Sequence, residues 1–261
     1  MELRVMAYNI YEGAMSEALG DRTEVILSTI QAIEPHILVM PESNGFEARR
    51  HRKLFDLEQT LGMRGFMAPA PTGYHLSIFI RPDLAPLEFQ PLAFPNANAG
   101  AALHVEFNGR RFWTIGVHFN PYNEPERIAE ASRFLHSAYR SAIMLGDFNA
   151  VRPDDPGFDQ VEETMQGYIK ARMGVGNGAG QLLDMLTGAG YTDLYRTLNP
   201  EKAEGTQPTV VAASEGELPR RIDYVLATGD LAATATECHV INNYITQRAS
   251  DHYPVTANFD V

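Results

Sequence analysis

The sequence predicts a mixed α/β or α+β fold, and three observations support this prediction. Short apolar runs rich in branched residues recur along the chain and are typical of buried strands. Segments with apolar residues at helical spacing separate several of these runs. The pair Asn108-Gly109 stands between two strand-like runs and indicates a hairpin. This alternation of strands, hairpins and helices argues against a helical bundle.

Four helices are predicted from apolar spacing and from the residues that flank it. The first begins in an acidic segment and ends before Pro35, and the second ends at Gly62. Pro125 opens the third helix, and Gly188 or Gly190 closes the fourth. The predicted helical ranges are 21–34, 47–61, 124–140 and 181–190.

The predicted strands lie between and beyond these helices, at residues 3–8, 36–42, 76–80, 101–107, 110–117, 143–149, 221–227 and 253–261. The segment that follows residue 150 is acidic and glycine-rich, and we predict an irregular loop there. No Ser/Gly/Pro linker divides the chain, so we expect one domain over residues 1–261.

Polar residues follow or precede many of these apolar runs, from the first ten residues to the last twelve. They are Asn9, Glu42, His118, Asp147, Asn149, Asp223 and the triplet Ser250-Asp251-His252. We expect these strand ends to converge on one site. The carboxylates would repel each other there unless a cation lay among them, and an oxygen-rich site suits Mg²⁺ or Mn²⁺ rather than Zn²⁺.

Two short motifs make the pattern specific: Gly-Asp-Phe-Asn at 146–149 and Ser-Asp-His at 250–252. Arg221-Ile222-Asp223 lies between them, and Pro41-Glu42 lies near the start of the chain. In this combination and order, the chain resembles the endonuclease/exonuclease/phosphatase (DNase I-like) superfamily of metal-dependent phosphoesterases. The resemblance implies two packed β-sheets flanked by helices, and hydrolysis of a phosphate ester by in-line attack of water.

Three residues are the predicted metal ligands. Glu42 ends a buried strand, where a lone carboxylate would be costly without a cation. Asn9 and Asp251 would complete or adjust the coordination of Mg²⁺ or Mn²⁺. The alternative for Glu42 is a helix cap or a surface acid, and the alternative for Asn9 is a turn residue.

Asp147 and Asn149 share one short turn, and residues two apart on an extended segment point the same way. Asp147 would then accept a proton from the attacking water, and Asn149 would donate to a phosphate oxygen. A turn with self-satisfied side chains is the alternative.

The resemblance assigns Asp223 to orient His252 and to favour its charged form. It assigns His252 to a hydrogen bond with the scissile phosphate. His118 is a candidate general acid or phosphate ligand, and Asn120 a second phosphate donor. Since exonuclease III-type AP endonucleases usually have tyrosine at the position of His118, the chain is closer to the DNase I and phosphatase branches.

The composition of the chain bears on its cellular location and on its partners. The chain begins without a signal-like segment, has no apolar stretch long enough to span a bilayer, and has a single cysteine, Cys238. These features predict a cytoplasmic protein without a disulfide. The net charge of −12 lowers the expectation of a long nucleic-acid partner, because such binding needs basic surface.

Two charged segments bear on the substrate. Acids after the catalytic turn would repel the flanking phosphates of long DNA within a Debye length of about 8–10 Å; they are Asp154, Asp155, Asp159, Glu162 and Glu163. The basic run 49–53 could oppose them, but the solvated face of a helix is the preferred interpretation. We therefore predict a small phosphoester substrate. The alternatives are a nuclease acting on DNA or RNA, and a catalytically silent binding module.

Overall fold

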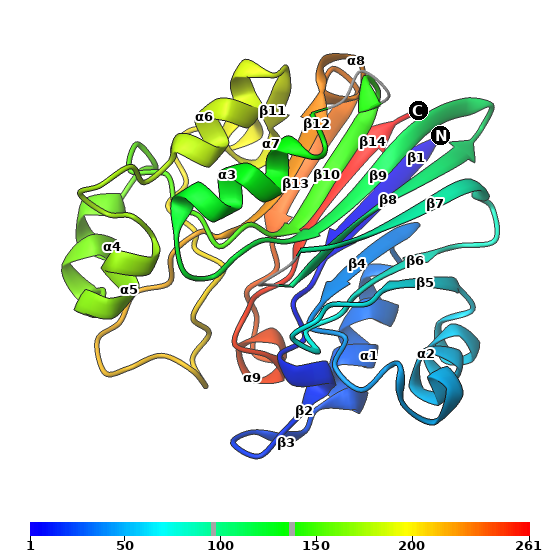
Figure 1. Ribbon diagram of the computed structural model, residues 1–261, viewed down its shortest axis with the longest axis horizontal. Helices are drawn as coiled ribbons and strands as arrows, with labels where there is room; N and C mark the ends of the chain where they lie inside the picture. The colour runs from blue at the N-terminus through cyan, green and yellow to red at the C-terminus, as the bar shows by residue number, and fades with distance from the viewer. Residues whose placement is uncertain (95–97, 136–138) are drawn as a thin grey trace.

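The computed structural model describes residues 1–94, 98–135 and 139–261. Two six-stranded sheets form its centre (Figure 1). The first has the order β13 (Ala235–Val240), β14 (Val255–Asp260), β1 (Glu2–Ala7), β4 (Ile37–Pro41), β6 (Leu76–Ile80) and β5 (Arg64–Ala68). The second has the order β11 (Tyr191–Asp193), β12 (Asp223–Thr228), β10 (Ala142–Asp147), β9 (Arg110–His118), β8 (Ala99–Phe107) and β7 (Ala85–Ala93). A short hairpin, β2 (Met15–Ser16) with β3 (Gly20–Asp21), stands apart.

Helices cover the outer faces of both sheets, which gives four layers (Figure 1). On the first sheet lie α1 (Thr23–Ile33) and α2 (Ala48–Leu61), and on the second α3 (Glu124–Ser132) and α6 (Gln181–Gly188). The shorter helices are η1 (Glu12–Ala14), α4 (Phe158–Thr164), α5 (Gly167–Arg172), α7 (Leu194–Leu198), α8 (Gly229–Ala232) and α9 (Thr246–Ala249). The predicted two-sheet α/β architecture is confirmed.

The apolar runs of the sequence become the layers of the core. Val5 and Val39 of the first sheet pack in one buried cluster with Leu145 and Val225 of the second. Burial on both faces explains why these strands are nearly continuous apolar runs. Strands β1 and β4 are parallel neighbours, and so are β9 and β10, so within each pair the carboxyl ends lie at the same edge of the sheet.

Local signals in the sequence explain two helix boundaries. Gly62 ends α2 in a left-handed conformation, and Asn123 caps α3 by accepting a hydrogen bond from the Glu126 amide. The predicted third helix was too long: α3 ends at Ser132, after which tighter turns such as Phe134 N to Ala131 O, 2.9 Å, replace it. The part of that prediction at 136–138 lies outside the described residues.

The segment after the catalytic turn is ordered into two helices, so the prediction of an irregular loop was wrong. Helices α4 and α5 form a small core of their own, with Phe158, Met165, Ile169 and Met173 packed around Ile222. The residues from 173 to 180 are turns, as predicted for this glycine-rich stretch.

The strands β9 and β10 approach each other closely at Gly146, directly before Asp147, and leave no room for a side chain there. Its φ is +140°, and a Cβ atom at this position would lie 2.0 Å from the Val117 carbonyl oxygen of β9. Gly146→Ala is therefore expected to lower the free energy of unfolding by about 2 kcal/mol or more, measured by urea denaturation. Gly188→Ala is the matched control, since nothing lies within 4 Å of that site. An unchanged stability of Gly146→Ala would show that β9 and β10 separate easily.

Candidate active site

Three predicted residues lie in one row at the edge of the second sheet. Asp147 ends the central strand β10, and it pairs in register with His118 of β9 on one side and with Asp223 of β12 on the other. All three are at least 97% buried. The strand pairing therefore determines their spacing, and this explains how residues more than a hundred positions apart come to share one site.

The first sheet brings its polar residues against this row. Asn9 follows β1, Glu42 follows β4, and His252 shortly precedes β14. The Asn9 amide nitrogen lies 3.1 Å from Asp147 Oδ2 and 3.3 Å from Glu42 Oε1, so a single side chain joins the two sheets. In the structure the polar residues at these strand ends lie together, as the sequence predicted.

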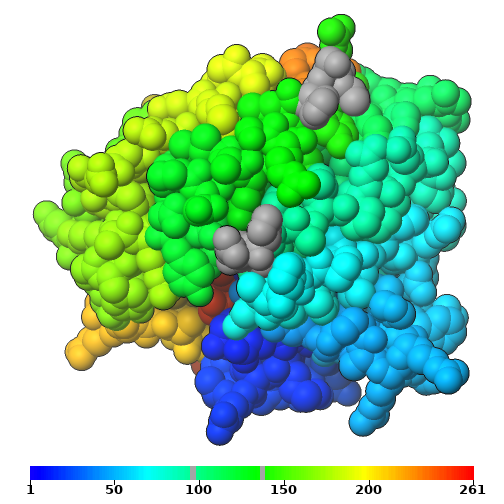
Figure 2. Space-filling model, viewed as in Figure 1, coloured from blue at the N-terminus to red at the C-terminus, as the bar shows by residue number. Residues whose placement is uncertain are grey.

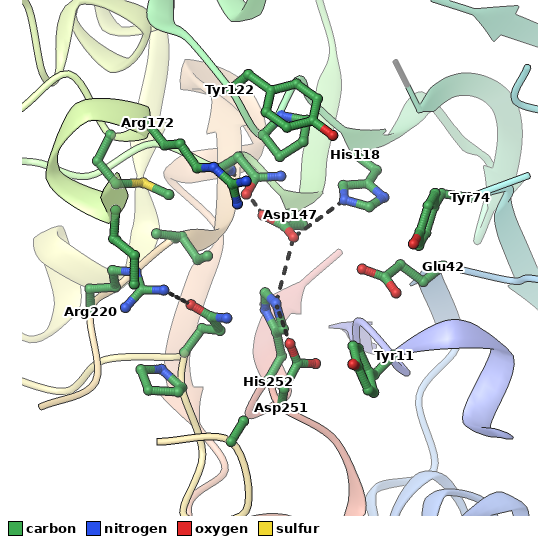
Figure 3. Close-up of a pocket in the computed structure, with 18 of the residues that line it drawn as sticks. Tyr11, Glu42, Tyr74, His118, Tyr122, Asp147, Arg172, Arg220, Asp251 and His252 are labelled. Atoms are coloured by element: carbon green, nitrogen blue, oxygen red, sulfur yellow. Dashed lines mark hydrogen bonds and ion pairs between the residues drawn. The ribbon is translucent and has the colours of Figure 1, made fainter. Parts of the chain in front are cut away.

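These residues open into a pocket of about 410 Å³. Figure 2 shows the N-terminal, central and C-terminal parts of the chain meeting on one face of the molecule. Six predicted residues line the pocket: Glu42, His118, Asp147, Asn149, Asp251 and His252. Figure 3 labels all of them except Asn149. Asn9 and Asp223 lie directly behind this lining and contact Asp147 and His252 respectively.

His252 is held as a cation by its neighbours. Its Nδ1 lies 2.8 Å from Asp223 Oδ2, and its Nε2 lies 3.7 Å from Asp147 Oδ2. Burial alone would lower the pKa of His252, but the carboxylates of Asp223, Asp251 and Asp147 together raise this pKa to about 10. The imidazolium is thus suited to hydrogen-bond an anionic phosphate.

His118 has the opposite electrostatics. Burial, and then the positive charge of His252, lower the pKa of His118 to about 3. The imidazole is neutral at pH 7, with Nε2 3.5 Å from Asp147 Oδ2. A neutral imidazole can donate a hydrogen bond to a phosphate oxygen, whereas it carries no extra proton to give to a leaving group.

Asp147 is buried between these two imidazoles. Burial raises the pKa of its carboxyl group, and the nearby His252 works against this rise. The Asn149 backbone amide donates to Asp147 Oδ1 over 2.9 Å, which leaves Oδ2 facing both imidazoles. A carboxylate whose proton affinity is raised in this way is suited to accept a proton from water near neutral pH.

Glu42 and Asp251 are the carboxylates among the predicted metal ligands. Burial raises the pKa of Glu42, and the negative charge of Asp251 raises it further. Glu42 Oε2 accepts from the Glu12 amide over 2.8 Å, which leaves lone pairs on both carboxylate oxygens. A buried carboxylate such as Glu42, with a second carboxylate nearby, fits a hard divalent cation such as Mg²⁺ or Mn²⁺.

A second group of residues could also hold a metal by proximity. Among the described residues, ligand atoms of Asp147, Asp223 and His252 all lie within 4.8 Å of one another. The ion pair between Asp223 and His252 accounts for this group, because an imidazolium has no lone pair with which to bind a metal. Glu42 and Asp251 therefore stay the predicted carboxylate ligands.

The turn at Asn149 differs from the extended geometry that the sequence suggested. Asn149 has a φ of 50°, and its amide nitrogen donates to the Phe119 carbonyl over 3.0 Å. It still lines the pocket and keeps a second N–H. Asp251 and His252 likewise both line the pocket, although an extended segment would have turned them apart.

Asn120 does not belong to the pocket lining. Its Oδ1 accepts hydrogen bonds from the backbone amides of Tyr122 and Asn123, at 2.8 and 3.3 Å. This arrangement is the turn motif in which an Asn side chain binds the backbone two or three residues further on. The predicted role of Asn120 as a phosphate donor stays a prediction.

The charged segments thought to rim the site lie outside the pocket lining. Asp155 pairs with Arg221 over 2.8 Å, and Asp154 with Arg152 over 2.9 Å, so these acids are partly neutralised. The basic run 49–53 belongs to α2, whose Leu57 is buried, as the preferred interpretation of a solvated helix face required.

Several pocket residues were not predicted from the sequence. They are Tyr11, Tyr74, Tyr122, Tyr168, Arg172 and Arg220, and Figure 3 shows all of them except Tyr168 by label. Tyr11 and Tyr122 each stand two positions after a predicted site asparagine, and this spacing was an available signal. Arg172 had none, because it lies in the segment that was predicted to be irregular.

Comparison with known proteins identifies the family. The model of the Endonuclease/Exonuclease/phosphatase family matches residues 6–252. The chain belongs to this family. The resemblance inferred from Gly-Asp-Phe-Asn and Ser-Asp-His is confirmed, and with it the class of activity: the chain is an enzyme that hydrolyses phosphate esters. No curated protein sequence matches the chain.

Solved structures share the fold at low sequence identity. A 3′ phosphatase, NExo, from Neisseria bound to a product DNA hairpin has a TM-score of 0.73 and 20% identity, with 99% of this chain and 100% of that chain covered. An AP endonuclease from Archaeoglobus fulgidus has a TM-score of 0.72 and 16% identity, with 99% and 100% covered. Truncated Caenorhabditis elegans TDP2 has a TM-score of 0.67 and 17% identity, with 100% and 98% covered.

Two expectations about the setting can be compared with the structure. Within the described residues no helix combines the length and the apolar character that a bilayer span needs. Cys238 is buried and free.

Proposed function

We propose that this family member hydrolyses a small phosphoester at the pocket described above, with a divalent cation, Mg²⁺ or Mn²⁺, held by Glu42 and Asp251. The hydrogen bonds that Asn9 donates toward Glu42 and Asp147 support a role for Asn9 in adjusting the coordination. When bound, the cation supplies charge neutralisation at the phosphoryl group.

Asp147 acts as the general base in this proposal. It accepts a proton from a water molecule that attacks phosphorus in line with the leaving oxygen. His252 donates a hydrogen bond to the scissile phosphate as an imidazolium, with Asp223 orienting the ring. Neutral His118 and the free N–H of Asn149 bind the remaining phosphate oxygens. The observation that carries the proposal is the position of Asp147 Oδ2, within 3.1 Å of Asn9 and within 3.7 Å of both imidazoles.

We still propose a small substrate, but the observation that supports it is now the pocket volume and not the charge of the acidic segment. The acids after the catalytic turn do not line the pocket, so their repulsion of DNA phosphates no longer supports a small substrate. The pocket volume of about 410 Å³ does, because it is typical of sites that enclose a small molecule. Duplex DNA would have to be bound by surface outside this pocket. The basic run at 49–53 does not line the pocket, so it adds no positive charge there.

The test of the proposal is an assay of bis(p-nitrophenyl) phosphate with Mg²⁺ or Mn²⁺, with and without EDTA. Turnover is expected only with the metal, and EDTA should abolish it. Turnover that survives metal removal would contradict the proposal, and so would a higher kcat/KM on plasmid or abasic duplex DNA than on the small diester.

Glu42→Gln tests the metal assignment. Removing one carboxylate charge from the donor set should raise the metal concentration for half-maximal activity by about tenfold or more. The measurement is the initial rate as a function of Mg²⁺ concentration. Glu17→Gln, an exposed acid of the turn between β2 and β3, is the matched control and should leave the curve unchanged. An unshifted curve for Glu42→Gln would remove Glu42 from the metal site.

A further inference from the structure

One wall of the pocket is built from two tyrosines and an arginine. The Arg172 guanidinium carbon lies 5.2 Å from the centre of the Tyr122 ring and 5.4 Å from that of the Tyr168 ring. All three side chains line the pocket, and Figure 3 shows Tyr122 and Arg172 beside His118 and Asp147. We call Tyr122, Arg172 and Tyr168 the Tyr–Arg wall.

A fully buried arginine holds the two segments of this wall together. Arg127 of α3, with 0% exposure, donates to the Asn120 carbonyl over 3.0 Å and to the Arg172 carbonyl over 2.8 Å. Its charge is balanced by Glu124 at 2.8 Å. The Asn120 side chain in turn accepts from the Tyr122 amide over 2.8 Å. Residues 122 and 172 are thus placed by a buried network and not by chance contact at the surface.

The wall offers the chemistry that recognises a nucleoside phosphate. Tyr122 and Tyr168 remain 57% and 56% exposed, so ring surface is free for stacking. No ion pair occupies the Arg172 guanidinium among residues 1–94, 98–135 and 139–261, whereas Arg220 on the same side of the pocket is paired with Glu217 over 2.9 Å. Aromatic faces that stack a base, next to an arginine that meets a phosphate oxygen, are the usual means of holding a single unpaired nucleotide.

We propose that the Tyr–Arg wall binds the nucleoside part of the substrate, so that the enzyme prefers a small phosphodiester carrying a nucleobase. The base stacks on the tyrosine rings, and the scissile phosphate lies between Arg172 and the residues around Asp147. This inference rests on the proposed hydrolytic function and specifies the substrate class of the same site.

The experiment compares two diesters with the same leaving group. One is the p-nitrophenyl ester of thymidine 5′-phosphate, and the other is methyl p-nitrophenyl phosphate, which lacks the nucleoside. We expect kcat/KM of the wild-type enzyme to be at least about tenfold higher for the thymidine ester. Tyr122→Ala and Tyr168→Ala should each reduce this ratio, and the double variant should bring it close to one, with turnover of the methyl ester retained.

Two further variants make the result specific. Tyr122→Phe keeps the aromatic ring and should keep the preference for thymidine. Tyr244→Ala is the matched control, because Tyr244 also stacks on an arginine, Arg248 at 4.6 Å, but is 71% exposed and outside the pocket lining. It should leave the ratio unchanged.

Equal kcat/KM for the two esters in the wild-type enzyme would overturn the inference, and so would a preference that survives in the double variant. Either result would leave the proposed function intact as long as the methyl ester is hydrolysed with metal. Absence of metal-dependent turnover of both esters would instead overturn the proposed function itself, and the inference with it.

Discussion

Asp147→Asn is expected to lower kcat by at least about 10²-fold, the effect of losing a positioned general base. The substitution keeps the shape of the side chain at the end of β10 but removes the group that accepts the proton from water. The loss should appear in kcat at saturating Mg²⁺, measured from initial rates on bis(p-nitrophenyl) phosphate. The metal concentration for half-maximal activity should change little, because Asp147 is not among the proposed ligands.

Asp159→Asn provides the control for charge. It removes an equal charge from the exposed surface of α4, outside the pocket, and should leave kcat unchanged. If Asp147→Asn kept activity near that of the wild-type enzyme, another group would have to accept the proton, and the proposed division of roles would fail.

His252→Ala is expected to cost about 10²–10⁴-fold in kcat, because it removes the imidazolium that contacts the phosphate. Asp223→Ala should share much of this loss. Asp223 pairs with His252 Nδ1 over 2.8 Å and is among the carboxylates that raise the pKa of His252. Without Asp223 the His252 ring loses the partner that orients it, and the pKa of His252 falls.

The double variant is the informative measurement for this pair. Two residues that act as a unit give non-additive losses, so His252→Ala with Asp223→Ala should be little worse than His252→Ala alone. Far-UV circular dichroism of each variant checks that the buried substitutions leave the fold intact. Losses that simply multiply would show that Asp223 works independently of His252.

The sequence predicted most of the strands and the polar residues at their ends, because both are local properties. A buried strand of this fold is a short apolar run, and the residue after it, such as Glu42, is recognisable as a departure from that run. Which strands become neighbours is not local. The row of His118, Asp147 and Asp223 depends on the order β9-β10-β12, which no local pattern in the sequence indicates.

Helices α4 and α5 were missed for a different reason. Their apolar residues form a core together with Val151 and with Ile222, which lies far along the chain, and the acids of the segment suggested a solvated loop. The ion pair of Asp155 with Arg221 likewise joins residues 66 positions apart. Such contacts order the acidic segment and the helix α5 that follows it, whose Tyr168 and Arg172 line the pocket, and local composition carries no sign of them.

The backbone geometry at the site was also not predicted from the sequence. Glu42 and Asn149 have positive φ values of 59° and 50°, in a region that few residues other than glycine adopt. Predictions based on alternation along an extended segment cannot anticipate such residues. Strained backbone of this kind is concentrated at functional sites, where the surrounding structure holds it in place.

The most direct test of the account compares metal activation curves for three forms of the enzyme: wild type, Asp147→Asn and Glu42→Gln. The account predicts that Asp147→Asn lowers the maximal rate without moving the midpoint, while Glu42→Gln moves the midpoint to higher metal concentration. Identical responses of the two variants to Mg²⁺ would contradict it, because a metal ligand and a general base must differ in this measurement.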